Sequence, residues 1–217
     1  MVRRSHDSVE HGETRSVRVL LVEEIELFRT ALVSLLSKEG DIEVVADLKC
    51  DPEMVVSTAS RVRPDVTVVA VDDGNTAGLA TIRALREGEA EHRVVALTLG
   101  WPVGLVDRLI TAGVCGLADK NAEALRLLRA IRVVAGGGTA LDEGLDAVLA
   151  AVRASPFTPR ERDVLQVVAK GVSGPEIARA LSLSPGTVRN YLSNVLTKTG
   201  ARNRIDAIRI AKEAGWF

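Results

Sequence analysis

Between residues 17 and 135, short apolar runs alternate five times with segments of helical periodicity, and few folds accommodate that order. The apolar runs cover residues 17–22, 42–47, 66–71, 93–99 and 115–118, and the helical segments cover 28–40, 54–63, 79–86, 103–112 and 122–135. Uninterrupted apolar runs are typical of strands that are buried on both faces of a parallel sheet. The alternation therefore predicts a doubly wound α/β domain with a five-stranded parallel sheet.

The C-terminal stretch, residues 157–217, has a different pattern, with three helix starts that are visible in its side-chain chemistry. Two capping boxes and one Ser-Pro step mark these starts: Thr158 with Glu161, Ser173 with Glu176, and Ser184 with Pro185. A short helix over 176–181, a turn at 182–183 and a longer helix from residue 185 follow from them. This order predicts a helix-turn-helix.

A net charge of −1 conceals an acidic N-terminal part and a basic C-terminal part. Residues 157–217 hold ten Lys or Arg and five Asp or Glu, so the remainder carries a net charge of −6. This asymmetry indicates an anionic polymer as the partner of the C-terminal part. Glycines at 136–138 and the Ser155-Pro156 step mark the boundary. We predict a flexible tail over 1–16, an α/β domain over 17–136, a linker over 137–156 and a helical domain over 157–217.

Several classes of protein are disfavoured by the sequence. No apolar run reaches the ~18–20 residues of a membrane span, and the polar N-terminus lacks the apolar core of a secretory signal. Cys50 and Cys115 stand far apart, which indicates neither a disulfide framework nor a zinc site. No GxGxxG or Walker A loop follows the first apolar run. We expect a cytoplasmic protein that is not an enzyme and has no metal, cofactor or membrane contact.

The longer helix of the predicted helix-turn-helix has one apolar side and one polar side. The apolar stripe consists of Val188, Leu192, Val195 and Leu196, and the polar side carries Thr187, Arg189, Asn190, Ser193, Asn194 and Lys198. Arginine can pair with guanine and asparagine with adenine in the major groove, whereas Thr187 and Lys198 suit phosphate oxygens. The polar side is therefore a candidate DNA-reading surface, and a solvated helix face is the alternative.

TPRERDVL, followed by GVSGPEIARALSLSPGTVRNYLSNVLTKTGARNR, resembles the LuxR-type helix-turn-helix, and residues 17–217 resemble the NarL/FixJ-type response regulators. The resemblance implies a receiver domain joined to a domain that binds double-stranded promoter DNA. It also implies that Arg189, Asn190 and Ser193 contact bases, and that the final helix contributes to a dimer.

The final predicted helix, residues 204–214, carries more apolar residues than one buried face requires. Two stripes are predicted, and one of them needs a further surface, for which a second copy is the simplest choice. The candidate dimerisation residues are Ile205, Ile208, Ile210 and Ala211. The partner is either the same chain or a related regulator, and each dimer would bind two DNA half-sites.

The resemblance also implies a receiver pocket, in which an aspartate accepts a phosphoryl group beside Mg²⁺. In this sequence the acidic pair matches Glu23 and Glu24, the hydroxyl matches Thr98 and the lysine matches Lys120. The acceptor position matches Ala70, whose methyl group can neither form an acyl phosphate nor ligate a metal. We therefore predict a degenerate receiver that acts independently of phosphorylation at this position.

Other departures from the receiver pattern agree with this prediction, although three alternatives stay open. Leu117 replaces the usual aromatic residue of the fifth strand, and glutamates replace aspartates in the acidic pair. Asp72 or Asp73 could serve as a displaced acceptor, or the vacated pocket could bind a polar or anionic small molecule. The two glutamates could instead belong to a helix start or pair with Lys120.

Overall fold

The computed structural model describes residues 15–72, 76–87 and 92–216, so most of the predicted tail lies outside the described residues. Its central element is a parallel sheet in the order β2-β1-β3-β4-β5-β6. The strands are β1 (Val17–Val22), β2 (Ile42–Leu48), β3 (Val66–Ala70), β4 (Val94–Thr98), β5 (Gly116–Asp119) and β6 (Ala140–Leu141).

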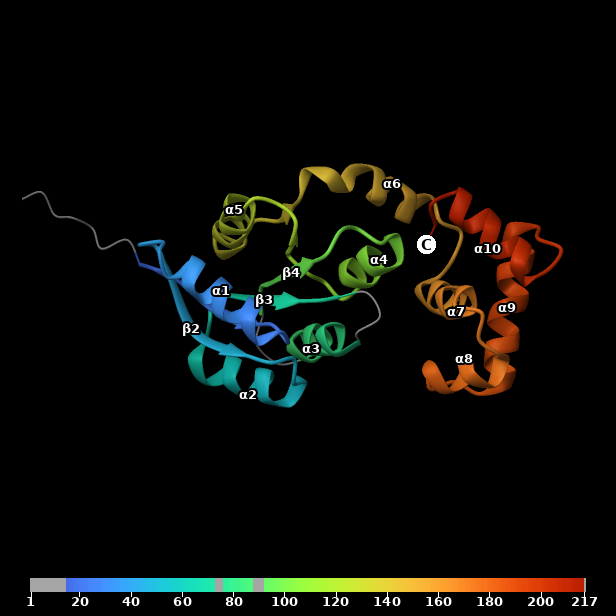
Figure 1. Cartoon of the computed structure of the whole chain (residues 1–217), viewed down its shortest axis with the longest axis horizontal. Helices are drawn as coiled ribbons and strands as arrows, with labels where there is room; N and C mark the ends of the chain where they lie inside the picture. Colours follow the sequence, from blue (N-terminus) through green and yellow to red (C-terminus); the bar gives the residue numbers. More distant parts are fainter. Residues whose placement is uncertain (1–14, 73–75, 88–91, 217) are drawn as a thin grey trace, which may run out of the picture.

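Helices cover both faces of this sheet (Figure 1). They are α1 (Glu26–Leu36), α2 (Pro52–Val62), α3 (Thr76–Glu87), α4 (Val103–Thr111) and α5 (Ala124–Ala135). Successive strand residues point to opposite faces, so Leu20 packs with α2, α3 and α4 while Leu21 packs with α1 and α5. The prediction of a doubly wound α/β fold is confirmed.

The segment over 137–156 contains a short strand and a helix, so the sheet has six strands where the sequence predicted five. After Gly137, which has a positive φ of 85°, β6 pairs with β5 and extends the sheet. A 3-10 turn (Glu143–Leu145) and α6 (Asp146–Ala154) follow, and Leu145 is fully buried in the same core cluster as the apolar residues of α4. A two-residue strand is too short to show any periodicity, which is why the sequence did not reveal it.

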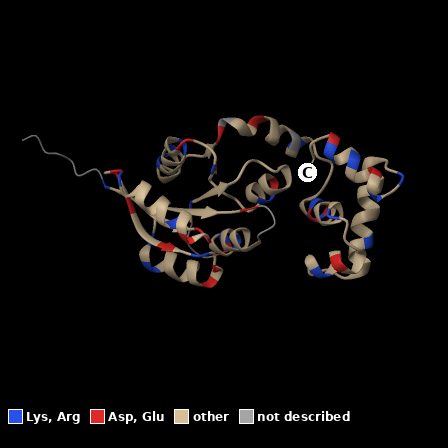
Figure 2. Ribbon diagram, in the orientation of Figure 1, with Lys and Arg blue, Asp and Glu red and all other residues tan. Residues whose placement is uncertain are grey.

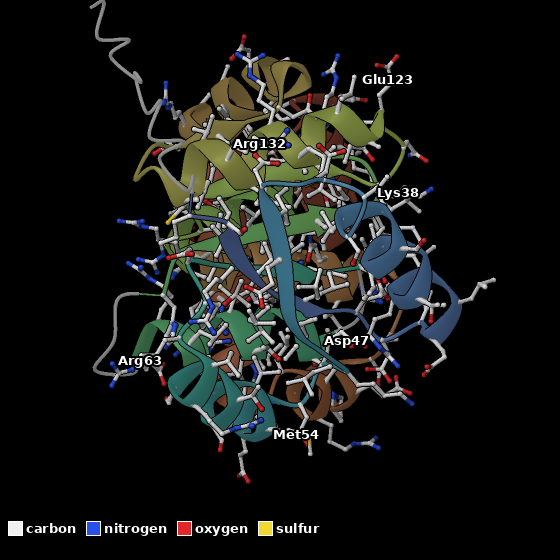
Figure 3. The ribbon with its side chains drawn as sticks, turned by 90° about the vertical axis from the view of Figure 1, so that its left-hand side faces the viewer. Lys38, Asp47, Met54, Arg63, Glu123 and Arg132 are labelled. Carbon is white, nitrogen blue, oxygen red and sulfur yellow. The ribbon has the colours of Figure 1, made fainter. Side chains whose placement is uncertain are left out.

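Ion pairs link helices α1 and α5 to the two ends of β2, which is an edge strand of the sheet. Figure 3 labels Arg132 and Asp47 near opposite ends of β2. At one end, Arg132 on α5 bonds Asp41 and Glu39, each at 2.7 Å. At the other end, Asp47 accepts a hydrogen bond of 3.1 Å from Arg29 on α1. These contacts hold α1 and α5 on one face of the sheet.

The helical domain consists of α7 (Pro159–Ala169), α8 (Gly174–Ala180), α9 (Pro185–Thr199) and α10 (Arg204–Glu213). The predicted capping box of α7 is present, with Thr158 N 2.8 Å from a Glu161 carboxylate oxygen. Phe157 meets Trp216 edge-on, with ring centroids 5.6 Å apart, and closes one end of the core. Among the described helices, none combines the length and apolar character that a bilayer-spanning segment needs.

Candidate nucleic-acid interface and receiver pocket

Helix α9 is fixed at both ends by local chemistry. Ser184 Oγ accepts a hydrogen bond of 3.1 Å from Thr187 N at its start, and Gly200 ends it with a φ of 65°. The predicted apolar stripe is confirmed, since the residues that face the domain core are Val188, Leu192, Val195 and Leu196. The inward stripe determines which side of α9 faces solvent.

Four of the six predicted DNA-reading residues share the solvent-exposed side of α9: Arg189, Asn190, Ser193 and Asn194. This helix lies on the side of the helical domain that faces away from the α/β domain (Figure 1). Lys and Arg also lie along the neighbouring α10 (Figure 2). The reading side is therefore open to a large partner while the two domains are in contact.

Lys198, the predicted phosphate contact at the end of α9, is engaged elsewhere. Its Nζ lies 2.5 Å from an oxygen of Glu161, whose side chain is only 3% exposed. Burial favours the neutral form of Glu161, but hydrogen bonds from Lys198 and Thr158 outweigh that effect and hold its pKa below the ordinary value. Lys198 neutralises a buried carboxylate in this structure, and its contact with phosphate stays a prediction.

Thr187, the other predicted phosphate contact, is half-buried at the start of α9. Its Oγ1 lies 2.8 Å from Ser184 Oγ, so the hydroxyl takes part in the cap of the helix. Its backbone N–H is also bound to Ser184. Thr187 therefore shapes the start of α9, and the free reading groups begin at Arg189.

Three apolar residues of α10 form its buried face, and they come from both of the stripes that the sequence predicted. Ala207 and Ala211 are 1% and 0% exposed, and Ile208 packs beside them. At 100° per residue these three positions share one side of a helix, so Ile208 and Ala211 serve the domain core. Of the predicted dimerisation residues, Ile205 is 72% exposed and Ile210 is half-buried.

The receiver pocket residues meet at the C-terminal edge of the sheet, as parallel strands require. Glu23 and Glu24 follow β1, Ala70 ends β3, Thr98 ends β4 and Lys120 follows β5. Sequence reasoning therefore placed all five in one region. The side chain at the acceptor position is a methyl group, and Ala70 is only 6% exposed.

Lys120 lies between two carboxylates in this pocket. Its Nζ is 3.2 Å from Glu23 Oε2 and 2.9 Å from Asp72 Oδ1, and the side chain is 10% exposed. The other oxygen of Glu23 accepts a hydrogen bond of 2.8 Å from Ile25 N at the start of α1. Glu23 thus caps the start of α1 and pairs with Lys120, which are the two structural roles that the sequence left open. Asp72, one of the two candidate displaced acceptors, forms an ion pair with Lys120. Asp73, the other candidate, lies outside the described residues.

The remaining polar groups of the pocket are bound locally. Thr98 Oγ1 donates to Gly100 O at 2.9 Å, and Glu24 accepts from Cys50 N at 3.3 Å. Burial and the neighbouring carboxylates raise the pKa of Cys50 to about 11, so its thiol stays protonated and unreactive. Within the described residues, no group of three or more His, Cys, Asp or Glu is arranged to hold a metal ion.

A seam of ion pairs, which the sequence did not reveal, joins α4 to α7. Arg162 Nη2 lies 2.8 Å from Asp107 Oδ2, and Arg108 Nη1 lies 3.2 Å from Asp163 Oδ1. The first pair is almost fully buried. Burial raises the pKa of Asp107 despite the attraction of Arg162, and burial lowers the pKa of Arg162. The two domains are thus joined by charges that burial disfavours.

Residues 155–211 match the family described as "Bacterial regulatory proteins, luxR family". Response regulator RamR of Streptomyces coelicolor is 40% identical over 205 residues, which cover 92% of this chain and 98% of RamR. This chain belongs to the LuxR-type response regulators. Transcriptional regulatory protein DesR of Bacillus subtilis is 35% identical to this LuxR-type regulator, over 93% of the chain and 99% of DesR.

Solved structures agree with this assignment of the LuxR-type regulator. The response regulator ChrA of a heme-sensing two-component system superposes with a TM-score of 0.53 at 28% identity, and the alignment covers 93% of this chain and 99% of ChrA. A structure of RcsB dimers bound to DNA has the same fold, with a TM-score of 0.62 at 17% identity over 91% of this chain and 98% of that one. The chain is a DNA-binding response-regulator transcription factor.

Proposed function

We propose that this regulator binds specific promoter sequences through α9 and does so without phosphorylation of its receiver-like domain. The observation that carries the proposal is Lys120, which is held between Glu23 and Asp72 while a methyl group stands at Ala70. A phosphoryl group needs a carboxylate to carry it, and Ala70 offers none. Lys120 already has the counter-charge that a phosphoryl group would supply.

The Asp72 contact argues further against a phosphate-driven switch. An ion pair between groups that are partly removed from water is less screened than a surface pair, so Asp72 holds Lys120 in place without a ligand. The switch partner in β5 is Leu117, which is buried in the core and has no polar group to report a change at Thr98. The pocket is thus a fixed structural element in this proposal.

Sequence choice would come from the exposed side of α9. Arg189 can donate two hydrogen bonds to one guanine, and Asn190 and Asn194 can pair with adenine. Ser193 is exposed beside them and suits either a base edge or a phosphate. A single helix-turn-helix reads only a few base pairs, so we propose that two copies bind two half-sites, with Ile205 and Ile210 in the contact between copies.

A phosphorylation assay tests the proposal directly. The full chain would be treated with acetyl phosphate or with beryllofluoride, and its affinity for a footprinted promoter fragment would be compared with that of untreated protein. We expect the same affinity and no gain of one phosphate in the intact mass. The matched control is Asp72→Asn. A mass gain in the unaltered chain that disappears in this variant would establish Asp72 as a displaced acceptor and overturn the proposal.

A further inference from the structure

A cleft of about 370 Å³ lies between the two domains of this regulator, where α3 and α4 face α7 and the turn after α8. Both domains contribute charged side chains to its wall. These are Asp72, Arg83 and Arg108 from the α/β domain, and Arg160, Asp163 and Lys170 from the helical domain. Four of these six side chains are cationic, and this excess suits an anion.

The two carboxylates of the cleft are already occupied by cations. Asp163 lies 3.2 Å from Arg108 and 3.6 Å from Arg160, and Asp72 lies 2.9 Å from Lys120. Neither of these two carboxylates of the cleft wall therefore remains to balance Arg83 and Lys170.

Arg83 and Lys170 supply the positive charge that the carboxylates of the described cleft wall leave unbalanced. Neither side chain makes an ion pair or a hydrogen bond with any residue in the described ranges, and both are exposed to solvent. The hydroxyls of Thr76 and Ser182 also line the cleft and can donate to an anion. A concave surface focuses the field of such charges more strongly than a flat one.

We propose that this cleft binds a small molecule with two or more anionic groups, phosphates or carboxylates, which contacts Arg83 on one domain and Lys170 on the other. The inference deepens the proposed function, because it supplies a control input to a regulator that does not use phosphorylation. Such a molecule binds only while the two domains are in contact, and so it stabilises that arrangement.

The seam of ion pairs between α4 and α7 lies beside the cleft, and it makes the contact between the domains sensitive to a bound ligand. Nε and Nη1 of Arg162 are buried without hydrogen-bond partners among the described residues. A buried pair of this kind contributes little net stability, since the loss of hydration offsets the attraction. A ligand of modest affinity can therefore shift the balance between joined and separated domains.

Calorimetric titration of the full chain with pyrophosphate and with citrate tests the inference in the absence of DNA. We expect saturable binding of at least one probe, and about tenfold weaker binding after Arg83→Ala or Lys170→Ala, since each removes one charged contact. Arg61→Ala, an exposed position on α2, is the charge-matched control and should leave binding unchanged.

The reading side of α9 is the competing location for an anion, so Arg189→Ala completes the set. If Arg189→Ala abolishes probe binding while Arg83→Ala leaves it intact, the anion occupies the DNA-reading side and the inference is overturned. No saturable binding of either probe up to about 10 mM would overturn it as well. Neither outcome touches the proposed function, whose test measures DNA affinity and phosphate incorporation.

Discussion

Lys198 at the end of α9 and Glu161 in the first turn of α7 form an ion pair of 2.5 Å, although 37 residues separate them in the sequence. Glu161 is also the acceptor in the capping box of α7. One carboxylate thus fixes the start of the first helix and the end of the reading helix. The orientation of the reading side therefore depends on a contact within the helical domain.

Lys198→Ala should destabilise the helical domain by about 3 kcal/mol, because it leaves the buried Glu161 without its counter-charge. Denaturant unfolding of the full chain, followed through the fluorescence of Trp101 and Trp216, measures this loss. Lys170→Ala serves as the control and should stay within about 0.5 kcal/mol, because that side chain is exposed. A Lys198→Ala variant that keeps full stability but binds all DNA sequences more weakly would restore the phosphate role.

The Glu161 pair also predicts a dependence of stability on pH. The folded domain holds the pKa of Glu161 below its ordinary value of 4.5, so the unfolded chain takes up the proton first as pH falls. The stabilisation is complete above pH 4.5 and is lost as pH falls through the lower, folded pKa. Unfolding free energies measured along a pH series should show this slope, and Glu161→Gln should remove it. An unchanged slope in Glu161→Gln would assign it to other carboxylates.

Arg189→Ala should relax the choice of base at one position of the half-site, at a cost of about 1–3 kcal/mol for the preferred sequence. The physical reason is the loss of two hydrogen bonds to a single base. Fluorescence anisotropy on a set of single-base variants of a footprinted site measures the effect. Arg61→Ala on α2 is the control and should leave both affinity and base preference unchanged. Uniform weakening across all sequences would mean that Arg189 contacts only phosphate.

The exposed position of Ile205 predicts a variant that separates dimerisation from folding. Ile205→Asp should leave the melting temperature nearly unchanged, because the side chain is 72% exposed. It should weaken binding to paired half-sites but not to a single half-site. Ala211→Asp at the buried face of α10 is the contrast and should unfold the domain. Normal cooperative binding by Ile205→Asp would place the contact between copies elsewhere.

The sequence was informative wherever a signal was local and periodic. Apolar runs located the first five strands, and the stripe through Val188 and Val195 oriented α9 correctly because helical period alone decides which side is buried. The contacts that the sequence missed join residues far apart along the chain, as with Lys198 and Glu161. On α10 the helical period predicted two apolar stripes but could not decide which packs on the core, and the buried Ala207 and Ala211 come from different stripes.

The seam between the domains predicts opposite effects for single and double replacements. Asp107→Leu alone leaves the guanidinium of Arg162 buried without its counter-charge, and should lower the unfolding free energy by about 3 kcal/mol. Asp107→Leu combined with Arg162→Met replaces both charges by apolar groups of similar size, so neither desolvation penalty remains. We expect the double variant to match or exceed the original stability, measured by denaturant unfolding of the full chain. If the double variant is as unstable as the single one, the pair is a net source of stability, and the seam is then too strong for a modest ligand to shift.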